Sequence, residues 1–410
     1  MNIENLLKKT ISSSQYRAIN ILSEQFDRLG IRAFIVGGTV RDILLGKAIT
    51  DIDIVLEADP QDVTSEFDVK CEVEVHSISQ FGTCKIILLD QIIDLAMARK
   101  EEYLSPGDLP VVEQASFEDD LARRDFSINA FAAGINSSDW CELIDFHDGL
   151  ADLTSKQIRV LHSKSFEDDP TRIFRGLRYS GRLGFDLEKG TQKKMMEGLS
   201  FLSLLSGVRL TNEIRKIFSE ENSDAILSLL DQYEVMTYAH ESFPNGADLT
   251  KRRDLLQSVG IDPHNRGFYA FVSLIGSTER QNAIERLNLG NEFMKFGSDI
   301  GRIELLEEKV SRSELNDQLK QISETAIMVA GTYVSRKTKS NLDLFLQELN
   351  EIKLLIDGQD LIDLGVPEGP RVGDVLSKTL AHMIESGSLS KSEQLIICLL
   401  YTSPSPRDRG

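Results

Sequence analysis

The sequence has no long apolar run and few cysteines, the residues whose disulfides stabilise small secreted folds. No segment approaches the ~20 consecutive apolar residues of a membrane-spanning helix, so no membrane partner is expected. The four cysteines lie far apart without a CxxC pair, which argues against a disulfide framework and a zinc site. The N-terminal segment has the pattern of an amphipathic helix and lacks the apolar core of a secretory signal. A cytoplasmic location is therefore expected.

Basic residues are scarce relative to acidic ones. The chain has 46 Lys and Arg against 65 Asp and Glu, a formal net charge of -19. As an average, this charge argues against a nucleic-acid partner, because phosphate groups favour basic surfaces. A net charge does not describe its distribution, however, and a basic face can coexist with an acidic remainder. The length of 410 residues allows two or more domains, and nothing in the sequence indicates an oligomeric state.

The pattern of apolar residues changes near residue 150. Before this point the periodicity predicts helices at 16–29 and 39–46 and strands at 32–38, 51–57, 71–78, 83–89 and 91–98. The segment 99–118, which contains SPGDLP, is predicted to be a loop. After residue 150 the strand patterns disappear and helical patterns dominate, as at 171–185, 210–220 and 225–236. The fold expected is α+β, a small mixed-sheet head followed by a mostly α-helical remainder.

A glycine pair links the strand that ends near residue 36 to the next helix. Gly37 and Gly38 would let a phosphate approach the backbone, and the free N–H groups of a helix N-terminus could bind it. Arg41, on the first turn of that helix, could add a charge-assisted contact. A glycine pair alone usually marks only a turn, so the prediction of a phosphate site depends on the carboxylates further along the chain.

Acidic residues come next at the spacing that a metal site needs. Asp51 and Asp53 alternate along a strand and therefore share one face. Two such carboxylates can hold a pair of divalent ions ~3.5–4 Å apart for in-line phosphoryl transfer, and Mg²⁺ suits oxygen ligands plus a triphosphate. Asp94, in an otherwise apolar strand, is the best third carboxylate. A lone DxD is usually solvated surface, but the ordered set of strand, glycines, helix and carboxylates is far more specific.

These segments resemble the polymerase-β-type nucleotidyltransferases, and more narrowly the class II tRNA nucleotidyltransferase and bacterial poly(A) polymerase family. The first matching segment is GGTVRDILLGKAITDIDIVL. Further matches occur in order at 93–103, 119–132, 143–153, 168–185 and 205–218, and a tail segment matches at 358–376. The sequence departs from the family pattern twice: Asp168 replaces the usual Glu at the start of the base-recognition motif (168–185), and Val208 stands where Glu is common in the motif after it. The second departure weakens the assignment of Arg209 and Glu213 to roles beyond packing.

The resemblance implies roles for residues of the later motifs. Arg124 is the implied triphosphate contact, and Asp125 and Asn129 would bind ribose hydroxyls or brace the site, with helix capping as the alternative for Asp125. Arg175 and Arg178 extend a basic stripe that could reach the triphosphate or the RNA backbone. The resemblance also implies CTP and ATP as substrates, a two-metal Mg²⁺ site at Asp51 and Asp53, and the tRNA 3′ end as acceptor.

Asp169 and Arg172 permit a physical interpretation of nucleotide choice. Their i, i+3 spacing predicts that they share a helix face. A carboxylate only accepts hydrogen bonds and a guanidinium only donates them. Cytosine and adenine each present an amino donor beside a ring-nitrogen acceptor, whereas uracil and guanine present the opposite pattern. The pair could therefore select C and A without a template. An exposed helix with structural ion pairs is the alternative.

The resemblance divides the chain into a catalytic head (1–150), a helical neck with the base-recognition helix (151–235), and a tRNA-binding body and tail (236–400). Residues 401–410 fit nothing before them and are expected to be a non-native tail. The expected activity is addition of CCA to tRNA. A-adding, CC-adding and poly(A) polymerase activities are alternatives, although the full-length segment after Asp94 counts against CC addition alone. Outside this class, a small-molecule or protein nucleotidyltransferase and a non-catalytic RNA-binding relative remain open.

Overall fold

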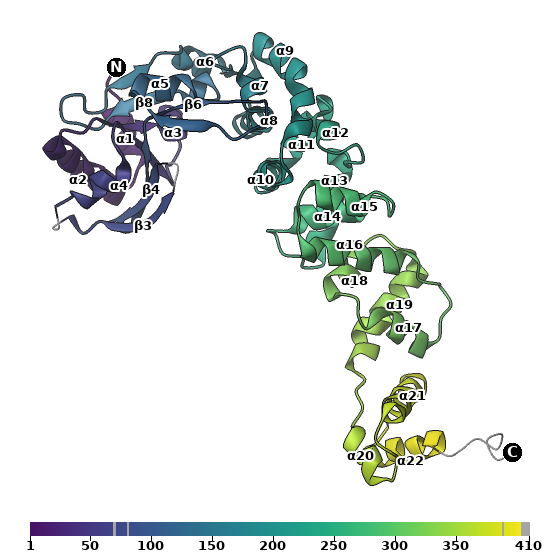
Figure 1. The fold of residues 1–410 in the computed structure, drawn as a ribbon. Coiled ribbons are helices and arrows are strands. Elements are labelled where there is room, and N and C mark those ends of the chain that lie inside the picture. Colours follow the sequence, from purple (N-terminus) through teal and green to yellow (C-terminus); the bar gives the residue numbers. More distant parts are fainter. Residues whose placement is uncertain (69–70, 80–81, 388, 403–410) are drawn as a thin grey trace. The chain divides into compact units, whose positions relative to one another are not determined.

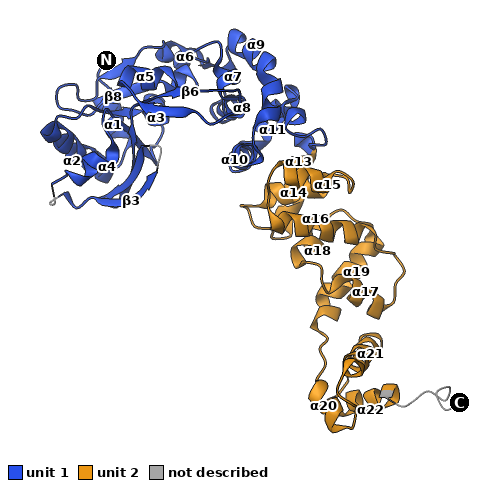
Figure 2. Ribbon diagram, in the orientation of Figure 1, with its two compact units in different colours: residues 1–247 blue, residues 248–410 orange. Residues whose placement is uncertain are grey.

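The computed structural model describes residues 1–68, 71–79, 82–387 and 389–402. The chain forms two compact units, Met1–Ala247 and Asp248–Gly410 (Figure 2). Strands occur in the first unit, and the described part of the second unit is helical (Figure 1). This arrangement confirms the α+β prediction of a mixed-sheet head followed by helices. The predicted divisions at residues 150 and 235 stay predictions, and residues 403–410 of the suspected tail lie outside the described part.

A seven-stranded mixed sheet forms the centre of the first unit. Its order is β3 (Glu74–Ser79), β4 (Thr83–Leu88), β5 (Gln91–Met97), β2 (Ile52–Leu56), β1 (Ala33–Val36), β8 (Phe131–Gly134) and β9 (Leu143–Asp145). Strands β2 and β5 run parallel, and the other neighbouring pairs run antiparallel. The parallel register places Asp53 directly opposite Asp94. Carboxylates about 40 residues apart in sequence are thus brought together by strand pairing.

The helices of the first unit are mostly short. They are α1 (Glu4–Thr10), α2 (Ser13–Leu29), α3 (Gly38–Leu44), α4 (Pro60–Ser65), α5 (Phe117–Ala122), α6 (Gly149–Ser155), α7 (Ser165–Asp168), α8 (Thr171–Leu183), α9 (Lys189–Gly198), α10 (Gly207–Phe218), α11 (Ser223–Gln232) and α12 (Val235–Ala239), with 3₁₀ turns η2 (Ser127–Asn129) and η3 (Leu199–Leu204). A capping box at Ser12 and Gln15 starts α2, and Gly30 ends it in the left-handed conformation. Local sequence therefore sets both ends of this long helix.

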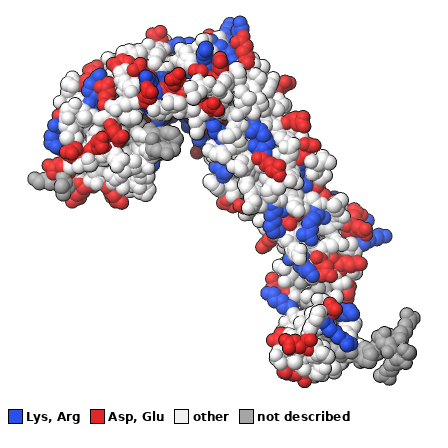
Figure 3. All heavy atoms as spheres, viewed as in Figure 1, with Lys and Arg blue, Asp and Glu red and all other residues white. Residues whose placement is uncertain are grey.

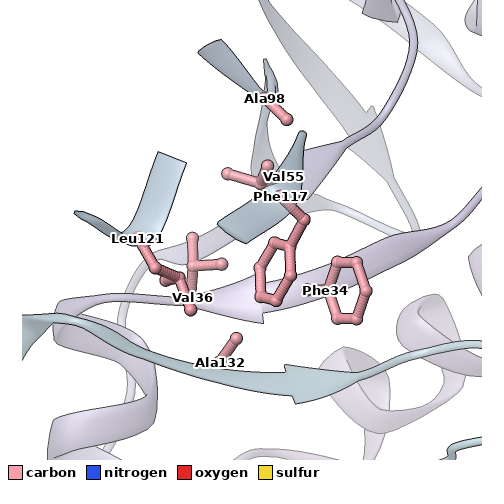
Figure 4. Close-up of a cluster of buried hydrophobic side chains, with 7 residues drawn as sticks. All are labelled: Phe34, Val36, Val55, Ala98, Phe117, Leu121 and Ala132. Atoms are coloured by element: carbon pink, nitrogen blue, oxygen red, sulfur yellow. The ribbon is translucent and has the colours of Figure 1, made fainter. Parts of the chain in front are cut away.

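Buried apolar residues fix the sheet to α5. The cluster comprises Phe34, Val36, Val55, Ala98, Phe117, Leu121 and Ala132 (Figure 4). Phe34 of β1 and Phe117 of α5 stack with ring centroids 3.7 Å apart. Both rings are fully buried. Because α5 leads directly into Arg123 and Arg124, this packing fixes the position of these two arginines.

Two predictions about secondary structure were wrong. The segment 99–118 is not simply a loop, because β6 (Arg99–Glu102) and β7 (Val111–Gln114) pair as an antiparallel hairpin. Strand β6 consists of charged residues, one of which forms the Lys100–Glu113 cross-strand ion pair at 2.9 Å, so no apolar alternation marked the hairpin. A two-residue parallel pair, β10 (Gln157–Ile158) with β11 (Asp186–Leu187), also occurs beyond residue 150. Strands this short produce no periodicity to detect.

The second unit consists of helices over its described length. They are α13 (Gly246–Ser258, which begins just before the unit), α14 (Arg266–Leu274), α15 (Arg280–Arg286), α16 (Asn291–Glu304), α17 (Arg312–Leu319), α18 (Glu324–Ala330), α19 (Arg336–Gln347), α20 (Gly358–Asp363), α21 (Pro370–Ser386) and α22 (Lys391–Thr402), with a 3₁₀ turn η4 (Leu349–Glu351). A small core of Ile356, Leu361, Val366, Val375 and Cys398 joins the last three helices. Within the described residues, no helix is both long and apolar enough to span a bilayer.

Candidate active site

A cleft of about 810 Å³ lies within the first unit and gathers nearly all of the predicted site residues. Its lining includes Gly37, Gly38, Arg41, Asp51, Asp53, Asp94, Arg124, Asp125, Asn129, Asp169, Arg172 and Arg175. These residues come from the sheet, from α3, from the turn after α5, and from the segment around α8. The fold therefore brings together side chains that span more than 120 positions of the sequence. Arg178 is the one predicted residue that does not line this cleft.

Three carboxylates, those of Asp51, Asp53 and Asp94, lie close together in the lining of the cleft. Partial removal of water by the surrounding protein, and next the charge of Asp94, raise the pKa of Asp53 above its ordinary value. Asp51 adds to this effect. Asp53 and its two neighbouring carboxylates offer the oxygen donors that a divalent cation binds, so the residues present fit Mg²⁺.

A lysine already neutralises one of these carboxylates. Lys85 of β4 lies 2.8 Å from the carboxylate of Asp94, its cross-strand neighbour. Among the described residues, no three His, Cys, Asp or Glu side chains converge into a ready-made metal cage. Mg²⁺ commonly binds to one or two carboxylates and completes its shell with water and substrate phosphates. The pair Asp51 and Asp53 is compatible with that mode of binding.

The glycine turn before α3 is sterically required. Gly37 has φ +67°, and a Cβ at this position would lie 2.6 Å from Nη1 of Arg124. Thr39, two residues later, contacts the DxD strand: its hydroxyl donates to the backbone oxygen of Asp51 at 3.2 Å. The turn thus brings the start of α3, the guanidinium of Arg124 and the carboxylate strand close together.

A chain of hydrogen bonds connects α3 to α8 beneath the cleft. Arg41 donates to Oδ1 of Asn129 at 2.6 Å, and Asn129 donates to Oδ1 of Asp125 at 3.1 Å. Arg175 donates two hydrogen bonds to Oδ2 of Asp125, at 2.6 and 2.8 Å. Burial would raise the pKa of Asp125, but the charge of Arg175 and the Asn129 hydrogen bond outweigh it and hold the pKa at about 2. Asp125 is therefore a buried, ionised brace between the head and α8.

Arg124 is oriented by a buried acid. Asp120 of α5 is fully buried and accepts hydrogen bonds from both Arg123 and Arg124. Burial opposes its ionisation, but the two guanidinium charges lower the pKa of Asp120. Arg124 also donates to the backbone oxygen of Asn129 at 3.5 Å. Its guanidinium is thus held beside the Gly37 turn, where it faces the cleft.

The prediction that Asp169 and Arg172 share a helix face was wrong. Asp169 has extended backbone angles at the end of α7, and α8 begins only at Thr171. Pro170 explains this, because a proline disfavours the helical conformation of the residue before it. Asp169 instead accepts hydrogen bonds from the backbone N–H of Thr171 at 3.0 Å and from its hydroxyl at 2.6 Å. Both predicted residues still line the cleft.

Arg172 is buried and partly committed to the protein. It donates to Oγ of Ser165 at 2.7 Å and to the backbone oxygen of Arg123 at 2.7 Å. A guanidinium has five N–H donors, so these contacts fix its plane and leave donors for a ligand. Arg178 has a different setting, because it donates to Oε1 of Glu220 at 3.1 Å.

The ring of Tyr179 lies among four arginines, one from α3 and three from α8. The guanidinium carbons of Arg41, Arg175, Arg178 and Arg182 lie between 5.0 and 5.7 Å from the centroid of the Tyr179 ring. Tyr179 and Arg182 line the cleft beside the residues predicted from the sequence. Arg178 belongs to this group, although it reaches the cleft only through its neighbours. A local concentration of positive charge therefore exists in a strongly acidic chain.

The sequence interpretation missed several lining residues. They are Thr39, Asp42, Arg99, Glu101, Tyr103, Pro110, Arg123, Tyr179, Arg182 and Arg209. Four of them, Arg99, Glu101, Tyr103 and Pro110, belong to the segment that was treated as a loop. Arg209 was given little weight because of the Val208 departure, yet it forms an ion pair with Asp169 at 2.6 Å. Its place in the sixth matching segment was the available signal.

Comparisons with known proteins agree with this geometry. Residues 33–159 match the family described as the Poly A polymerase head domain, and residues 184–245 match the probable RNA and SrmB-binding site of polymerase A. The A-adding tRNA nucleotidyltransferase of Aquifex aeolicus is 34% identical over 349 residues, which cover 79% of this chain and 41% of that protein. The chain spans less than half the length of the first curated relatives it matches, 41% and 48%.

Solved structures match over nearly the whole chain. A CCA-adding enzyme in an apo form aligns with a TM-score of 0.77 at 26% identity, covering 98% of this chain and 99% of that one. The Thermotoga maritima CCA-adding enzyme complexed with tRNA aligns with a TM-score of 0.69 at 26% identity and the same coverage. Complexes of a CCA-adding enzyme with CTP and with ATP are similar as well, with TM-scores of 0.74 and 0.72. The chain belongs to the family of class II tRNA nucleotidyltransferases and bacterial poly(A) polymerases.

Proposed function

We propose that this protein adds nucleotides to the 3′ end of tRNA, building CCA from CTP and ATP. The observation that carries the proposal is a single cleft whose lining combines the carboxylates Asp51, Asp53 and Asp94 with the pair Asp169 and Arg172. Several arginines line the same cleft. Such a cleft suits a nucleoside triphosphate, because its phosphates need cations and its base needs directional donors and acceptors. The similar enzymes with bound CTP, ATP and tRNA support these substrates.

The carboxylate end would carry the chemistry. Asp51 and Asp53 would hold Mg²⁺, which when bound would lower the pKa of the RNA 3′ hydroxyl and offset charge on the triphosphate. Asp94, paired with Lys85, would orient the acceptor hydroxyl from the neighbouring strand. The hydroxyl oxygen attacks the α-phosphorus, the bond to the bridging oxygen breaks, and pyrophosphate leaves.

The arginine region would hold the triphosphate. Gly37 and Gly38 would allow close approach of the phosphates, and Arg41, Arg124 and Arg175 line the same cleft. Asp125 and Asn129 act here by fixing the arginines through the hydrogen-bond chain described above. Fixed donors stabilise charge in the transition state without reorganising at the moment of reaction.

Asp169 and Arg172 would select the base. A carboxylate oxygen of Asp169 can accept from the amino group of cytosine or adenine, and a free N–H of Arg172 can donate to the adjacent ring nitrogen. Uracil and guanine reverse both groups, so they would leave two buried polar groups unpaired, which is costly. Selection of the base therefore needs no nucleic-acid template. We also propose a role in tRNA maturation in the cytoplasm.

Addition of A alone is a second candidate. It is favoured by one observation: the Aquifex aeolicus relative, at 34% identity, is an A-adding tRNA nucleotidyltransferase. An A-adding enzyme would share the cleft and the reaction but would act only on tRNA that already ends in CC.

The test is nucleotide incorporation in Mg²⁺ with tRNAs that lack CCA, end in the first C, or end in CC. Each would receive CTP, ATP, UTP or GTP, and then CTP together with ATP. Addition of C, C and A followed by a stop would establish CCA addition. Addition of A only to the CC-ending tRNA would establish the second candidate. No incorporation by folded protein on any substrate would refute both.

A further inference from the structure

Arg209 connects three separate elements at the base-reading end of the cleft. It lies on α10, close to the helix N-terminus. Its Nη2 donates to Oδ1 of Asp169 at 2.6 Å. Its Nη1 donates to the backbone oxygens of Gly107 and Asp108 at 2.7 and 3.2 Å. Both partners of the ion pair have side chains only 18% exposed, so the contact is sheltered from water.

The hydrogen bonds at Asp169 are unequally divided between its two carboxylate oxygens. Oδ1 accepts from Arg209, from the backbone N–H of Thr171 and from the hydroxyl of Thr171. Across the described part of the chain, no hydrogen-bond donor reaches Oδ2. Three donors on one oxygen fix the rotation of the carboxylate group. The second oxygen of this cleft-lining residue is thereby left with its full acceptor capacity.

The other contacts of Arg209 reach the β6–β7 hairpin loop (103–110). Gly107 has φ +81°, and a Cβ there would lie 3.3 Å from Cβ of Leu204, so this loop packs tightly against the 3₁₀ turn η3. Tyr103 and Pro110, at the two ends of the loop, line the cleft. The position of the loop and the orientation of Asp169 are therefore set by the same guanidinium.

We propose that Arg209 is a positioning residue for nucleotide selection: it locks the Asp169 carboxylate with Oδ2 presented to the base and ties that orientation to the hairpin loop. The inference rests on the proposed function, since it assumes that Asp169 reads the base. Arg209 does not touch the nucleotide in this scheme. Without it, Asp169 can rotate and present either oxygen, so correct and incorrect bases are separated less sharply.

The test measures kcat/KM for ATP and GTP on CC-ending tRNA, and for CTP and UTP on tRNA lacking CCA. In Arg209→Met, the correct-to-incorrect ratio is expected to fall about tenfold or more, because a charge-assisted contact that orients an acceptor is lost. The fall should come mainly from a higher KM for the correct nucleotide. Arg209→Lys keeps the charge, but one ammonium cannot span both the carboxylate and the loop carbonyls, so its ratio should be intermediate.

Two further variants separate positioning from general damage. Thr171→Val removes the hydroxyl donor to Oδ1 at nearly constant shape and should lower the ratio in the same direction by a smaller factor. Arg32→Met removes an arginine that pairs with Glu57 outside the cleft and should leave the ratio unchanged. Loss of folding alone lowers all four rates together and does not alter their ratio. If Arg209→Met does not fold, Arg209→Lys and Thr171→Val decide.

The outcomes distinguish this inference from the proposed function. The positioning role is overturned if the wild type has a high correct-to-incorrect kcat/KM ratio and the Arg209 and Thr171 variants all keep that ratio. This result would leave the proposed activity intact. A wild-type protein without any incorporation overturns the proposed function instead. Equal falls in the ratio for Arg209→Met and for Arg32→Met would also contradict the inference, because they would show a general charge effect.

Discussion

At the scale of single residues, the cleft is held in place by charges that pair with each other below its surface. Asp125 is 7% exposed and joins Arg175, which in turn lies on the helix just after Asp169. A buried ion pair adds little net stability when it forms, but removing one partner leaves the other charge uncompensated. The pair therefore specifies where Arg175 lies rather than how stable the fold is.

Asp125→Asn is expected to lower the free energy of unfolding at pH 7 by ~2–3 kcal/mol, because Arg175 loses its counter-ion. The pKa of Asp125 is lowered from 3.8 to about 2 in the folded protein. Its ionisation therefore stabilises the fold above the unfolded value, and this stabilisation is lost as pH falls through the folded value. Urea unfolding at pH 7 and pH 3 should show a gap between variant and wild type that narrows with acid. A gap independent of pH would contradict the assignment.

Asp53→Asn is expected to abolish nucleotide incorporation while tRNA binding is kept, since Asp53 would hold Mg²⁺. The same variant should be slightly more stable than wild type at pH 7 in chelator. The pKa of Asp53 is raised, so its ionisation opposes folding at every pH above that raised value, and the amide removes this cost. Thermal unfolding with EDTA and filter binding of tRNA would measure both effects. Nucleotide incorporation retained by Asp53→Asn would contradict the proposed role of Asp53 in binding Mg²⁺.

The sequence predicted which residues reach the cleft better than it predicted their geometry. Gly37, Asp51 and Asp53 were predictable because glycine freedom and strand alternation are local properties. The setting of Asp169 was not inferred, although the adjacent Pro170 was the local signal that it lies outside the helix. Contacts such as Arg209 with Asp169 join residues 40 positions apart and depend on tertiary packing.

At the scale of elements, the hairpin and α8 illustrate two different limits of pattern reading. Helix α8 buries an apolar stripe, so its periodicity predicted it nearly to its ends. Strand β6 (RKEE) is charged at every position and β7 (VVEQ) does not alternate, so no apolar alternation distinguishes the hairpin from a loop. Helices that pack on a core are visible in sequence, whereas strands stabilised by polar pairs at a cleft are not.

The close approach of α8 to α11 supplies a test of this packing. A Cβ at Gly181 would overlap Cγ1 of Ile226 and lie 3.3 Å from its backbone nitrogen, so the side chain cannot simply rotate away. Gly181→Ala is therefore expected to destabilise the protein by ~1–2 kcal/mol, despite the higher helix propensity of alanine. Chemical unfolding measures the change.

Gly373→Ala is the matched control on a different helix. Gly373 lies within α21 and has no heavy atom within 4 Å of an added Cβ. Its substitution is expected to be neutral or stabilising by up to ~1 kcal/mol, because only the propensity gain applies. Equal changes in the free energy of unfolding at both glycines would mean that the close approach of α8 to α11 does not exclude a Cβ at Gly181.

At the scale of the whole molecule, the cleft is a local exception to the charge of the chain. All of the residues that line the cleft belong to the first unit. Acidic and basic side chains are interspersed over the face in view (Figure 3), and the formal net charge is -19. The arginines around Tyr179 concentrate positive charge that the average hides. The RNA binding proposed above would therefore depend on the distribution of charge rather than on the net charge.

The distribution of charge determines the sign of a salt dependence. If the average charge governed association, salt would screen repulsion and tRNA affinity would rise with ionic strength. If local arginines contact phosphates, counterions are released and affinity falls, by about tenfold or more between ~50 and ~200 mM salt. We expect the fall, measured by fluorescence anisotropy with labelled tRNA. Arg182→Gln should make the logarithmic slope shallower by about one unit, because Arg182 is a cleft arginine whose ion pair with Glu220 is long, at 3.7 Å. A tRNA affinity that rises with salt would contradict this prediction, because it would mean that the cleft arginines do not govern tRNA binding.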